Sequence, residues 1–368
     1  MKKIIFKKIS IDIAYFFLLA IFSLGSIIWV LQAVNFLDIV VEDGHGLVIY
    51  LYYTLLSLPK ILSKILPFAL FFSFFYIFLK YENNNELLIF WNFGISKKKF
   101  VNYFLRLSFL FLLVQFTFTI FLVPNSQNIA RSFIKNSNVD LFEGMIREKK
   151  FIDTFLNLTI YVERKNSFGE LENVFLKDNT TNQITFAEKG IFEIRSNEKL
   201  LVLYDGKTIA KNGKQVSNIE FKKTDFNISK FTSKTTMVTK TQENSTIELI
   251  NCLYNFEKTG EFSGFINCRI ENKKNIIEEL YKRLVLPLYF PTFILIALML
   301  TIKSKEENKF NTYKLFIFLL GVIVLIFSEI SIKLITINLH DNINNLMFPF
   351  IIFITLYSIF FYKIRFKK

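Results

Sequence analysis

Hydrophobic residues along the chain fall into six long stretches, three before and three after a large polar insert. They cover residues 11–31, 47–79, 100–123, 280–302, 313–337 and 346–362. A bilayer core about 30 Å thick needs about 20 apolar helical residues, so each stretch is long enough to span it. The pattern predicts an α-helical membrane bundle of six transmembrane helices (3+3) with an inserted domain.

The short connections between these stretches are sorted by charge. Basic residues gather in 2–8, 80–99, 303–314 and 363–368, whereas 32–46 and 338–345 contain no lysine or arginine. Loops rich in lysine and arginine stay in the cytoplasm. We therefore expect both termini to be cytoplasmic and the insert 124–279 to lie outside.

The second stretch is too long for one perpendicular span. It contains Pro59 and Pro67, and each proline removes a helical hydrogen bond. We expect a short helix at about 47–58, followed by a separate span from about residue 60.

The insert follows a two-residue period, which is typical of strands. Alternating or β-branched runs occur at 159–163, 173–177, 183–187 and 190–195. Asp178-Asn179, Asp205-Gly206 and Asn212-Gly213 have the composition of hairpin turns. The insert is therefore expected to be an all-β, jellyroll-like domain. The predicted domains are 1–123 (three spans with a loop at 80–99), 124–275 (the β domain) and 276–368 (three spans).

Composition and candidate chemistry argue against an enzyme. A net charge of +14 would suggest a nucleic-acid partner in a soluble protein, but topology accounts for many of these basic residues, so none is expected. His45 and His340 lie in separate loops, which disfavours a metal site. Gly206-Lys207-Thr208 resembles the end of a phosphate-binding loop, yet residue 201 is Leu, and a hairpin turn is the better interpretation.

The two cysteines, Cys252 and Cys268, both fall in the outer insert. Two interpretations remain: a disulfide that closes a short loop in an oxidising compartment, or two thiols that occur there by chance.

The basic loop at 80–99 predicts a short amphipathic helix. Glu86 stands at its N-terminus, where the helix dipole favours an anion, and Gly94 stands near its C-cap. Its apolar stripe consists of Leu87, Leu88, Phe90 and Trp91. Such a helix either lies on the inner leaflet or docks into a cytoplasmic partner, and the residues alone leave both open.

Charged residues within or beside the spans are candidates for lipid or partner-helix contact. Glu329 and Lys333 are four residues apart on one face of the fifth span. They either pair with each other or meet a lipid phosphate or a partner helix. Lys282 and Arg283, at the outer end of the fourth span, either meet phosphates or anchor the helix at the interface.

The segment Asn85-Glu86-Leu87…Gly94-Ile95-Ser96 resembles the "sEl…aaGiS" signature of the lipopolysaccharide export permeases, the LptF/LptG (YjgP/YjgQ) family. Further segments resemble this family in the same order: 32–38, 58–68, 144–151 with 159–163, and 279–287. The resemblance covers nearly the whole chain. The segments 32–46 and 283–287 look more like LptF.

The resemblance implies a permease subunit of an ABC transporter in the inner membrane of a Gram-negative bacterium. Such permeases pair LptF with LptG, bind an LptB-like dimer of cytoplasmic ATPases, and associate with a single-span LptC-like jellyroll protein. They extract lipopolysaccharide and pass it to a periplasmic bridge. ATP and Mg would be bound by the partner, with no cofactor in this chain. The resemblance assigns ATPase coupling to Glu86, Leu87, Phe90, Trp91, Gly94 and Ser96, although 89–93 is bulkier than the family's Ala-rich stretch.

A different class of function would keep the same helices. A mechanotransmission permease, or a membrane sensor or scaffold that binds a periplasmic protein, needs no lipid groove. A bound lipid, or an apolar-lined interior in the β domain, would favour transport over these alternatives.

Overall fold

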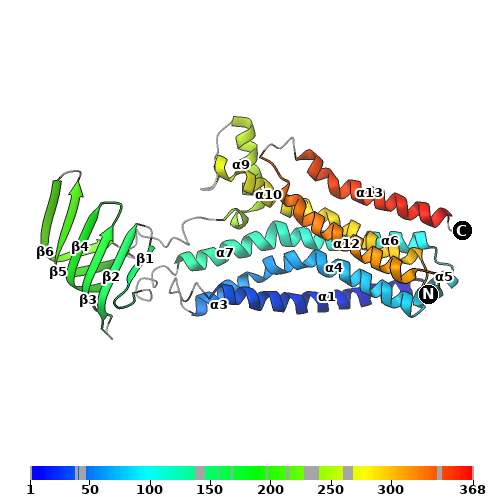
Figure 1. The fold of residues 1–368 in the computed structure, drawn as a ribbon, viewed down its shortest axis with the longest axis horizontal. Helices are drawn as coiled ribbons and strands as arrows, with labels where there is room; N and C mark the ends of the chain where they lie inside the picture. The colour runs from blue at the N-terminus through cyan, green and yellow to red at the C-terminus, as the bar shows by residue number, and fades with distance from the viewer. Residues whose placement is uncertain are drawn as a thin grey trace. The chain divides into compact units, whose positions relative to one another are not determined.

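A computed structural model describes residues 2–37, 40, 47–136, 146–155, 157–166, 169–195, 198–212, 215–227, 240–259, 268–337 and 342–366. It contains six helical segments long and apolar enough to cross a membrane (Figure 1). These are Ile4–Asn35, Leu47–Asn83, Lys97–Ile134, Ile270–Ile302, Phe310–Lys333 and Ile343–Ile364. The predicted six-helix bundle is confirmed.

The helices before the β domain are α1 (Lys2–Asn35), α3 (Leu47–Leu56), α4 (Leu58–Asn83), α5 (Glu86–Asn92), α6 (Lys97–Thr117), the π-helix η1 (Phe118–Leu122) and α7 (Val123–Asn136). Those after it are η3 (Thr241–Glu243), α9 (Thr246–Thr259), η4 (Ile270–Asn272), α10 (Lys273–Leu284), η5 (Leu286–Tyr289), α11 (Phe290–Leu298), η6 (Met299–Ile302), α12 (Phe310–Lys333) and α13 (Ile343–Phe366). The expected break in the second stretch lies at Ser57, between α3 and α4, with Pro59 in the first turn of α4.

A proline within α4 frees a backbone carbonyl that a neighbouring helix satisfies. Pro67 has no N–H, so the carbonyl of Ser63, four residues earlier, lacks its usual helical donor. The side-chain amide of Gln115 in α6 donates to that carbonyl at 3.0 Å. In lipid an unpaired backbone group is costly, so this contact compensates for the proline and joins two spans.

The same arrangement recurs at three other prolines. In each case the residue four before the proline accepts a hydrogen bond from a side-chain hydroxyl of a different helix. Thr246 donates to the carbonyl of Ile120, four residues before Pro124. Thr119 donates to the carbonyl of Arg283, four residues before Pro287. Tyr281 donates to the carbonyl of Asn345, four residues before Pro349. The corresponding distances are 3.1, 2.9 and 3.1 Å.

The core of the helical part is rich in aromatic rings. Phe71, Phe74, Phe78, Phe100 and Phe104 are fully buried among the spans. The helix α12 approaches α4 closely at Gly321, where an added Cβ would lie 2.0 Å from the ring of Phe71. Only glycine permits this contact without a shift of the ring.

The insert forms a six-stranded antiparallel sheet in the order β1-β2-β3-β4-β5-β6. The strands are β1 (Phe151–Phe155), β2 (Leu158–Lys165), β3 (Leu171–Asp178), β4 (Gln183–Arg195), β5 (Glu198–Asn212) and β6 (Gln215–Asn227). The inserted all-β domain is therefore confirmed. One refinement is that the described strands follow each other up and down, whereas a jelly roll crosses between two sheets.

One predicted turn is wrong. Asp205 and Gly206 lie inside β5, and Lys207 and Thr208 continue the same strand, so neither a hairpin turn nor a phosphate loop exists there. Asp205 has a φ of 47° and is skipped by the pairing with both β4 and β6. Asp tolerates positive φ, and here it adopts this conformation inside a strand whose register with both neighbours is unchanged on either side. The turn predicted near Asn212 is consistent with the pairing of that residue with Gln215, although Gly213 lies outside the described residues.

The predicted turn after β3 is present and is built on Asp178. Its carboxylate accepts hydrogen bonds from the backbone N–H of Thr180 at 2.8 Å, the hydroxyl of Thr180, and the hydroxyl of Thr181 at 2.9 Å. Partial burial raises the pKa of Asp178, but these hydrogen bonds outweigh burial and lower the pKa below its ordinary value.

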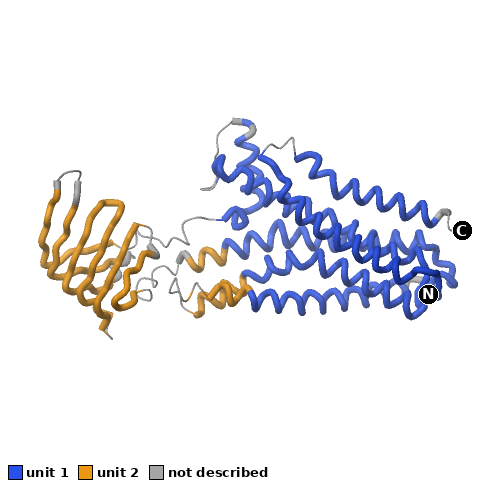
Figure 2. The backbone as a smooth tube through the Cα atoms, in the orientation of Figure 1, with its two compact units in different colours: residues 1–31, 57–128, 240–368 blue, residues 32–56, 129–239 orange. Residues whose placement is uncertain are grey.

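The chain divides into two compact units (Figure 2). The first comprises Met1–Leu31, Ser57–Asn128 and Lys240–Lys368, and the second comprises Gln32–Leu56 and Ile129–Thr239. The segment 240–259 therefore packs with the spans, although by topology it belongs to the insert.

Candidate functional site

The helix α5 is held firmly against the spans. Leu87 and Phe90 are buried at 0% and 7% exposure, and the ring of Phe90 contacts those of Tyr81 and Phe100. The carboxylate of Glu86 at the N-terminus lies 3.9 Å from the ammonium of Lys8. The predicted short helix is present, and two of its predicted coupling residues, Leu87 and Phe90, anchor it to the spans.

The end of α5 is shaped by the other predicted residues. Gly94 adopts a φ of 70°, as a residue after a helix C-cap commonly does. The side chain of Ser96 caps α6 by accepting the N–H of Lys99 at 3.4 Å. Trp91 packs edge-on against Phe100. These three residues fix the shape of the loop.

The apolar surface that α5 and the following residue expose matches the predicted stripe only at Leu88. Leu88, Ile89 and Phe93 are 44%, 51% and 49% exposed. A hollow of about 210 Å³ adjoins this surface and is lined by Ile4, Ile5, Lys8, Tyr81, Glu86, Ile89 and Phe90. Sequence reasoning missed Ile89 and Phe93, because it could not tell which apolar residues of a short helix face the bundle.

The loops at this end of the bundle are tied to one another. Glu82 accepts the backbone N–H of Lys305 at 2.8 Å, and the Lys305 ammonium donates to the carbonyl of Asn83 at 2.8 Å. Lys97 donates to the carbonyl of Ile302 at 3.3 Å. The basic loop 80–99 and the basic loop after η6 therefore form one connected structure.

A cleft of about 200 Å³ with charged residues in its lining lies at the opposite end of the spans. Its lining includes the cations Lys60, Lys64, Lys282 and Arg283, the anions Glu279 and Glu329, and Gln115, Thr119 and Gln242. Three lysines and two carboxylates line the cleft, so its lysines outnumber its carboxylates. A charged side chain within a membrane is stable only where it meets a partner or a water-filled cavity. The cleft is therefore suited to an anionic group.

Arg283 is not available to such a group. Its side chain is 2% exposed, and its Nε donates to Glu279 at 3.0 Å. Its two terminal nitrogens donate to the carbonyl of Asn244 at 2.9 Å, the hydroxyl of Thr246 at 3.0 Å and the carbonyl of Gln242 at 3.0 Å. Arg283 thus clamps the segment before α9 onto α10. Lys282 lies 4.0 Å from Glu279 with its side chain 44% exposed, and it remains accessible from the cleft.

Of the two alternatives for Glu329 and Lys333, the structure does not have the mutual ion pair. Glu329 lines the cleft, whereas Lys333 is exposed outside it, and no ion pair joins the two among the described residues. Both carry exposed side chains, so a group from outside the chain can reach them.

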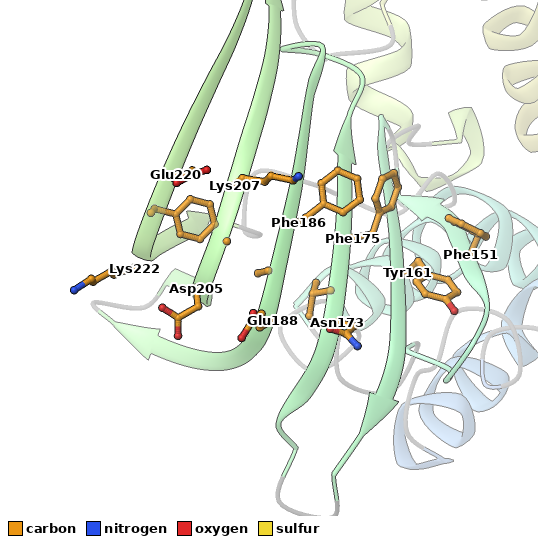
Figure 3. Close-up of a pocket in the computed structure, with 14 residues that line it drawn as sticks. Phe151, Tyr161, Asn173, Phe175, Phe186, Glu188, Asp205, Lys207, Glu220 and Lys222 are labelled. Carbon is orange, nitrogen blue, oxygen red and sulfur yellow. The ribbon is translucent and has the colours of Figure 1, made fainter.

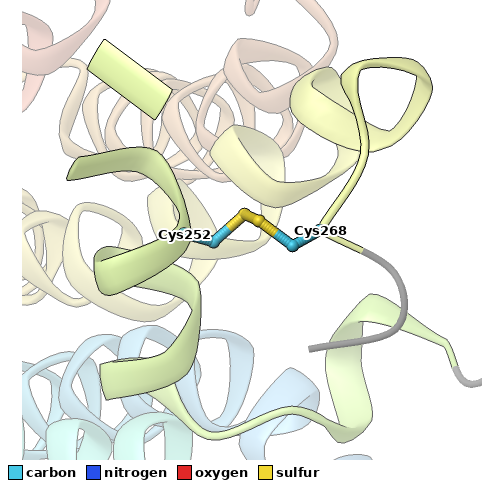
Figure 4. Close-up of a disulfide and its surroundings, with 2 residues drawn as sticks. All are labelled: Cys252 and Cys268. Carbon is cyan, nitrogen blue, oxygen red and sulfur yellow. A yellow bond between two sulfur atoms is a disulfide. The ribbon is translucent and has the colours of Figure 1, made fainter. Parts of the chain in front are cut away.

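The two cysteines are bonded to each other (Figure 4). Cys252 in α9 and Cys268 just before η4 lie with their Cα atoms 6.0 Å apart, and both side chains are buried with Leu249 and Ile276. Of the two interpretations, the structure has the disulfide.

One face of the sheet carries an aromatic row (Figure 3). Phe151, Tyr161, Phe175 and Phe186 are direct cross-strand partners on successive strands, with ring centroids 4.8 to 5.2 Å apart for the first and last pairs. Lys207 and Glu220 continue the row on β5 and β6. A hollow of about 820 Å³ lies over this face. The opposite face packs a core that includes Ile160, Val162, Val174, Leu176, Leu201 and Leu203.

Metal chemistry finds no support in the part of the chain that the structure describes. No group of three or more His, Cys, Asp or Glu side chains could hold a metal there. His45 and His340 lie outside the described residues.

Comparison with known proteins gives two findings. The model of the family described as lipopolysaccharide export system permease LptF/LptG matches residues 9–363. The chain is also similar to Uncharacterized protein RP871 of Rickettsia prowazekii (strain Madrid E), with 23% identity over 294 residues, which is 76% of each chain.

Proposed function

Because the chain belongs to the lipopolysaccharide export system permease LptF/LptG family, we propose that it is one half of a permease that lifts lipopolysaccharide out of the inner membrane and passes it to a periplasmic bridge. Members of this family are transmembrane subunits of an ABC transporter and not its catalytic subunits. The observation that carries the proposal is the match over 9–363, which includes the spans, the basic loop and the sheet together.

The proposed ATPase contact is the exposed face of α5. Leu88, Ile89 and Phe93 supply apolar area, and Glu86 supplies a charge beside them. The anchors Leu87 and Phe90 hold this face rigid against the spans. A rigid face loses little side-chain entropy on docking, which favours transmission of a partner's movement. The partners would be an LptB-like ATPase dimer, a paralogous permease and an LptC-like single-span protein.

The proposed lipid contacts lie at the other end of the spans and on the sheet. Lipopolysaccharide combines phosphate groups with acyl chains, and each exposed methylene costs about 0.8 kcal/mol in water. Lys60, Lys64 and Lys282 offer cations to the phosphates. The aromatic row on the sheet offers apolar surface to acyl chains, a feature that the sensor and scaffold alternatives do not need.

The topology is part of the same proposal. Both termini and the loops 80–99 and 303–314 would be cytoplasmic, and the domain at 124–275 would be periplasmic between membrane parts 1–123 and 276–368. The charge sorting of the loops supports this orientation. Between the two paralogues, the segments 32–46 and 283–287 favour the LptF side.

The test is Glu86→Ala in proteoliposomes that contain the permease pair and the ATPase. We expect lipopolysaccharide release per ATP hydrolysed to fall, while insertion and subunit recovery stay unchanged. Glu306→Ala is the matched control, because Glu306 is an exposed glutamate of the other basic loop. Wild-type transport by Glu86→Ala would refute the assigned contact. Failure to recover an ATPase or lipopolysaccharide with the wild-type chain would instead favour a sensor or scaffold.

A further inference from the structure

The helix α9 carries an apolar stripe that the described part of the chain leaves exposed. Ile247, Ile250 and Tyr254 are 69%, 46% and 61% exposed. Their spacing of three and four residues places them on one narrow face of the helix. Ile270, 65% exposed in η4, adds to the apolar surface beyond the disulfide.

The opposite face of α9 is fastened to the spans. Leu249, Cys252 and Leu253 are buried in one cluster with Ile276 and Ile277 of α10. The disulfide from Cys252 fixes the middle of α9, and Arg283 clamps the residues immediately before it. The uncovered stripe therefore faces outward in a fixed direction.

The contacts of α9 place it at one end of three spans. The hydroxyl of Thr246, its first residue, donates to the carbonyl of Ile120 near the end of the third apolar stretch and accepts from Arg283 near the start of the fourth. The cluster beneath α9 includes Ile332 and Ile335, at the end of the fifth. Figure 1 shows α9 running across the direction of the spans. A helix crossing at this level lies where the hydrocarbon core meets the headgroups.

The chemistry of the exposed face fits that level. Tyrosine and lysine are characteristic of the membrane interface, and the ammonium of Lys258 lies 5.7 Å from the ring centroid of Tyr254. Two further apolar residues, Leu334 and Ile337, follow the end of α12 and are 49% and 53% exposed at the same end of the spans. Lipid that covers these residues also reaches α9.

We propose that α9 is an interfacial helix whose stripe Ile247, Ile250 and Tyr254 is embedded in the leaflet on the side of the inserted domain. The disulfide and Arg283 hold it there, so that the ends of the third, fourth and fifth spans keep a fixed depth. The proposal depends on the six spans crossing a bilayer and is independent of the transported molecule.

The experiment uses the full chain in vesicles of phosphatidylethanolamine and phosphatidylglycerol. Ile250→Cys and, as the matched control, Glu248→Cys are each labelled with a polarity-sensitive fluorophore; the sequence's two other cysteines are bonded and do not react. Glu248 is exposed on the same helix outside the stripe. Quenching is measured with lipid that carries a nitroxide near the headgroup, and separately with aqueous iodide.

We expect the label at 250 to shift to the blue, to be quenched by the nitroxide lipid and to be shielded from iodide, with the reverse at 248. Labels at 247 and 254 should behave like that at 250. Two outcomes overturn the proposal: iodide reaching 250 as readily as 248, or shielding of 250 from both quenchers, which would mean that protein covers the stripe. Unchanged tryptophan fluorescence of each variant shows that it is folded.

Discussion

Replacement of Gln115 by leucine tests whether side-chain hydrogen bonds to the carbonyls freed by prolines stabilise the packing of the spans. The amide of Gln115 donates to the carbonyl of Ser63, which Pro67 deprives of its helical partner. Gln115→Leu removes this donor and leaves the carbonyl unpaired between two spans. Pro67→Ala restores a backbone N–H at position 67, which can bond the same carbonyl within α4.

The expected cost follows from the contacts. Hydrogen bonds between membrane helices contribute about 0.6 kcal/mol on average and at most about 1.7 kcal/mol. The substitution also removes Oε1 of Gln115, which is buried without a hydrogen-bond partner among the described residues, and this offsets part of the loss. We expect Gln115→Leu to lower the free energy of unfolding by about 1 kcal/mol in the native background. In the Pro67→Ala background the cost should fall close to zero.

The assay is unfolding of the purified chain by SDS titrated into mild detergent, followed by the fluorescence of Trp29 and Trp91. Four proteins complete a double-mutant cycle: wild type, each single variant, and both together. Independent sites add within about 0.3 to 0.5 kcal/mol, so a coupling near 1 kcal/mol is measurable. Equal costs of Gln115→Leu in the two backgrounds would refute the reasoning, because the amide would then contribute nothing through the freed carbonyl.

Three further predictions test other contacts. Arg283→Met should lower the free energy of unfolding by about 3 to 5 kcal/mol, because it removes the closest partner of the largely buried Glu279 carboxylate together with the hydrogen bonds of Arg283 to residues 242–246. Lys282→Ala removes a half-exposed contact to the same carboxylate and should cost at most about 1 kcal/mol in the same SDS titration. Gly321→Ala should cost about 1 to 3 kcal/mol through its clash with the ring of Phe71, and Gly321→Ser should not recover it in that titration. The lowered pKa of Asp178 means that its carboxylate stabilises the folded β3–β4 turn above its ordinary pKa, and this contribution is lost as pH falls through the lowered value. The hydrogen-exchange protection factor of the Thr180 amide, which corrects for intrinsic exchange, should therefore fall on acidification in the wild type. In Asp178→Asn the protection factor should be low and flat with pH.

Much of the fold could be predicted because its causes are local. Span length and loop charge are properties of single segments, and the six predicted spans are those of the structure. The break at Ser57 follows from Pro59, and strands β2 and β3 from their alternation. The turn at Asp205 was mispredicted because an Asx-Gly pair with positive φ is typical of turns, whereas here the partner strands keep the residue inside a continuous strand.

The site was less predictable because it depends on which side of each helix is covered. Sequence reasoning found α5 and Glu86 but assigned Leu87 and Phe90 to a partner, whereas both are buried against the chain's own spans. Arg283 appeared as an interfacial cation, and the structure shows it clamping residues about forty positions earlier in the chain. Contacts between residues so far apart in the chain produce no periodic pattern in the sequence from which they could be predicted.

The proline contacts connect the two ends of the helical part. The helix α4 runs for 26 residues, with Ser63 beside the cleft and Glu82 tied to the loop that follows η6. A partner that moves α5 acts on the C-terminal end of α4, and the cleft lies near its N-terminal end. Pro67 interrupts the hydrogen-bond ladder between them, and Gln115 ties the weakened turn to α6. If α5 is the proposed partner contact, its displacement would reach the cleft through α4 and α6 together. The hydrogen bond that joins these two helices leaves no pattern of hydrophobic or charged residues in the sequence.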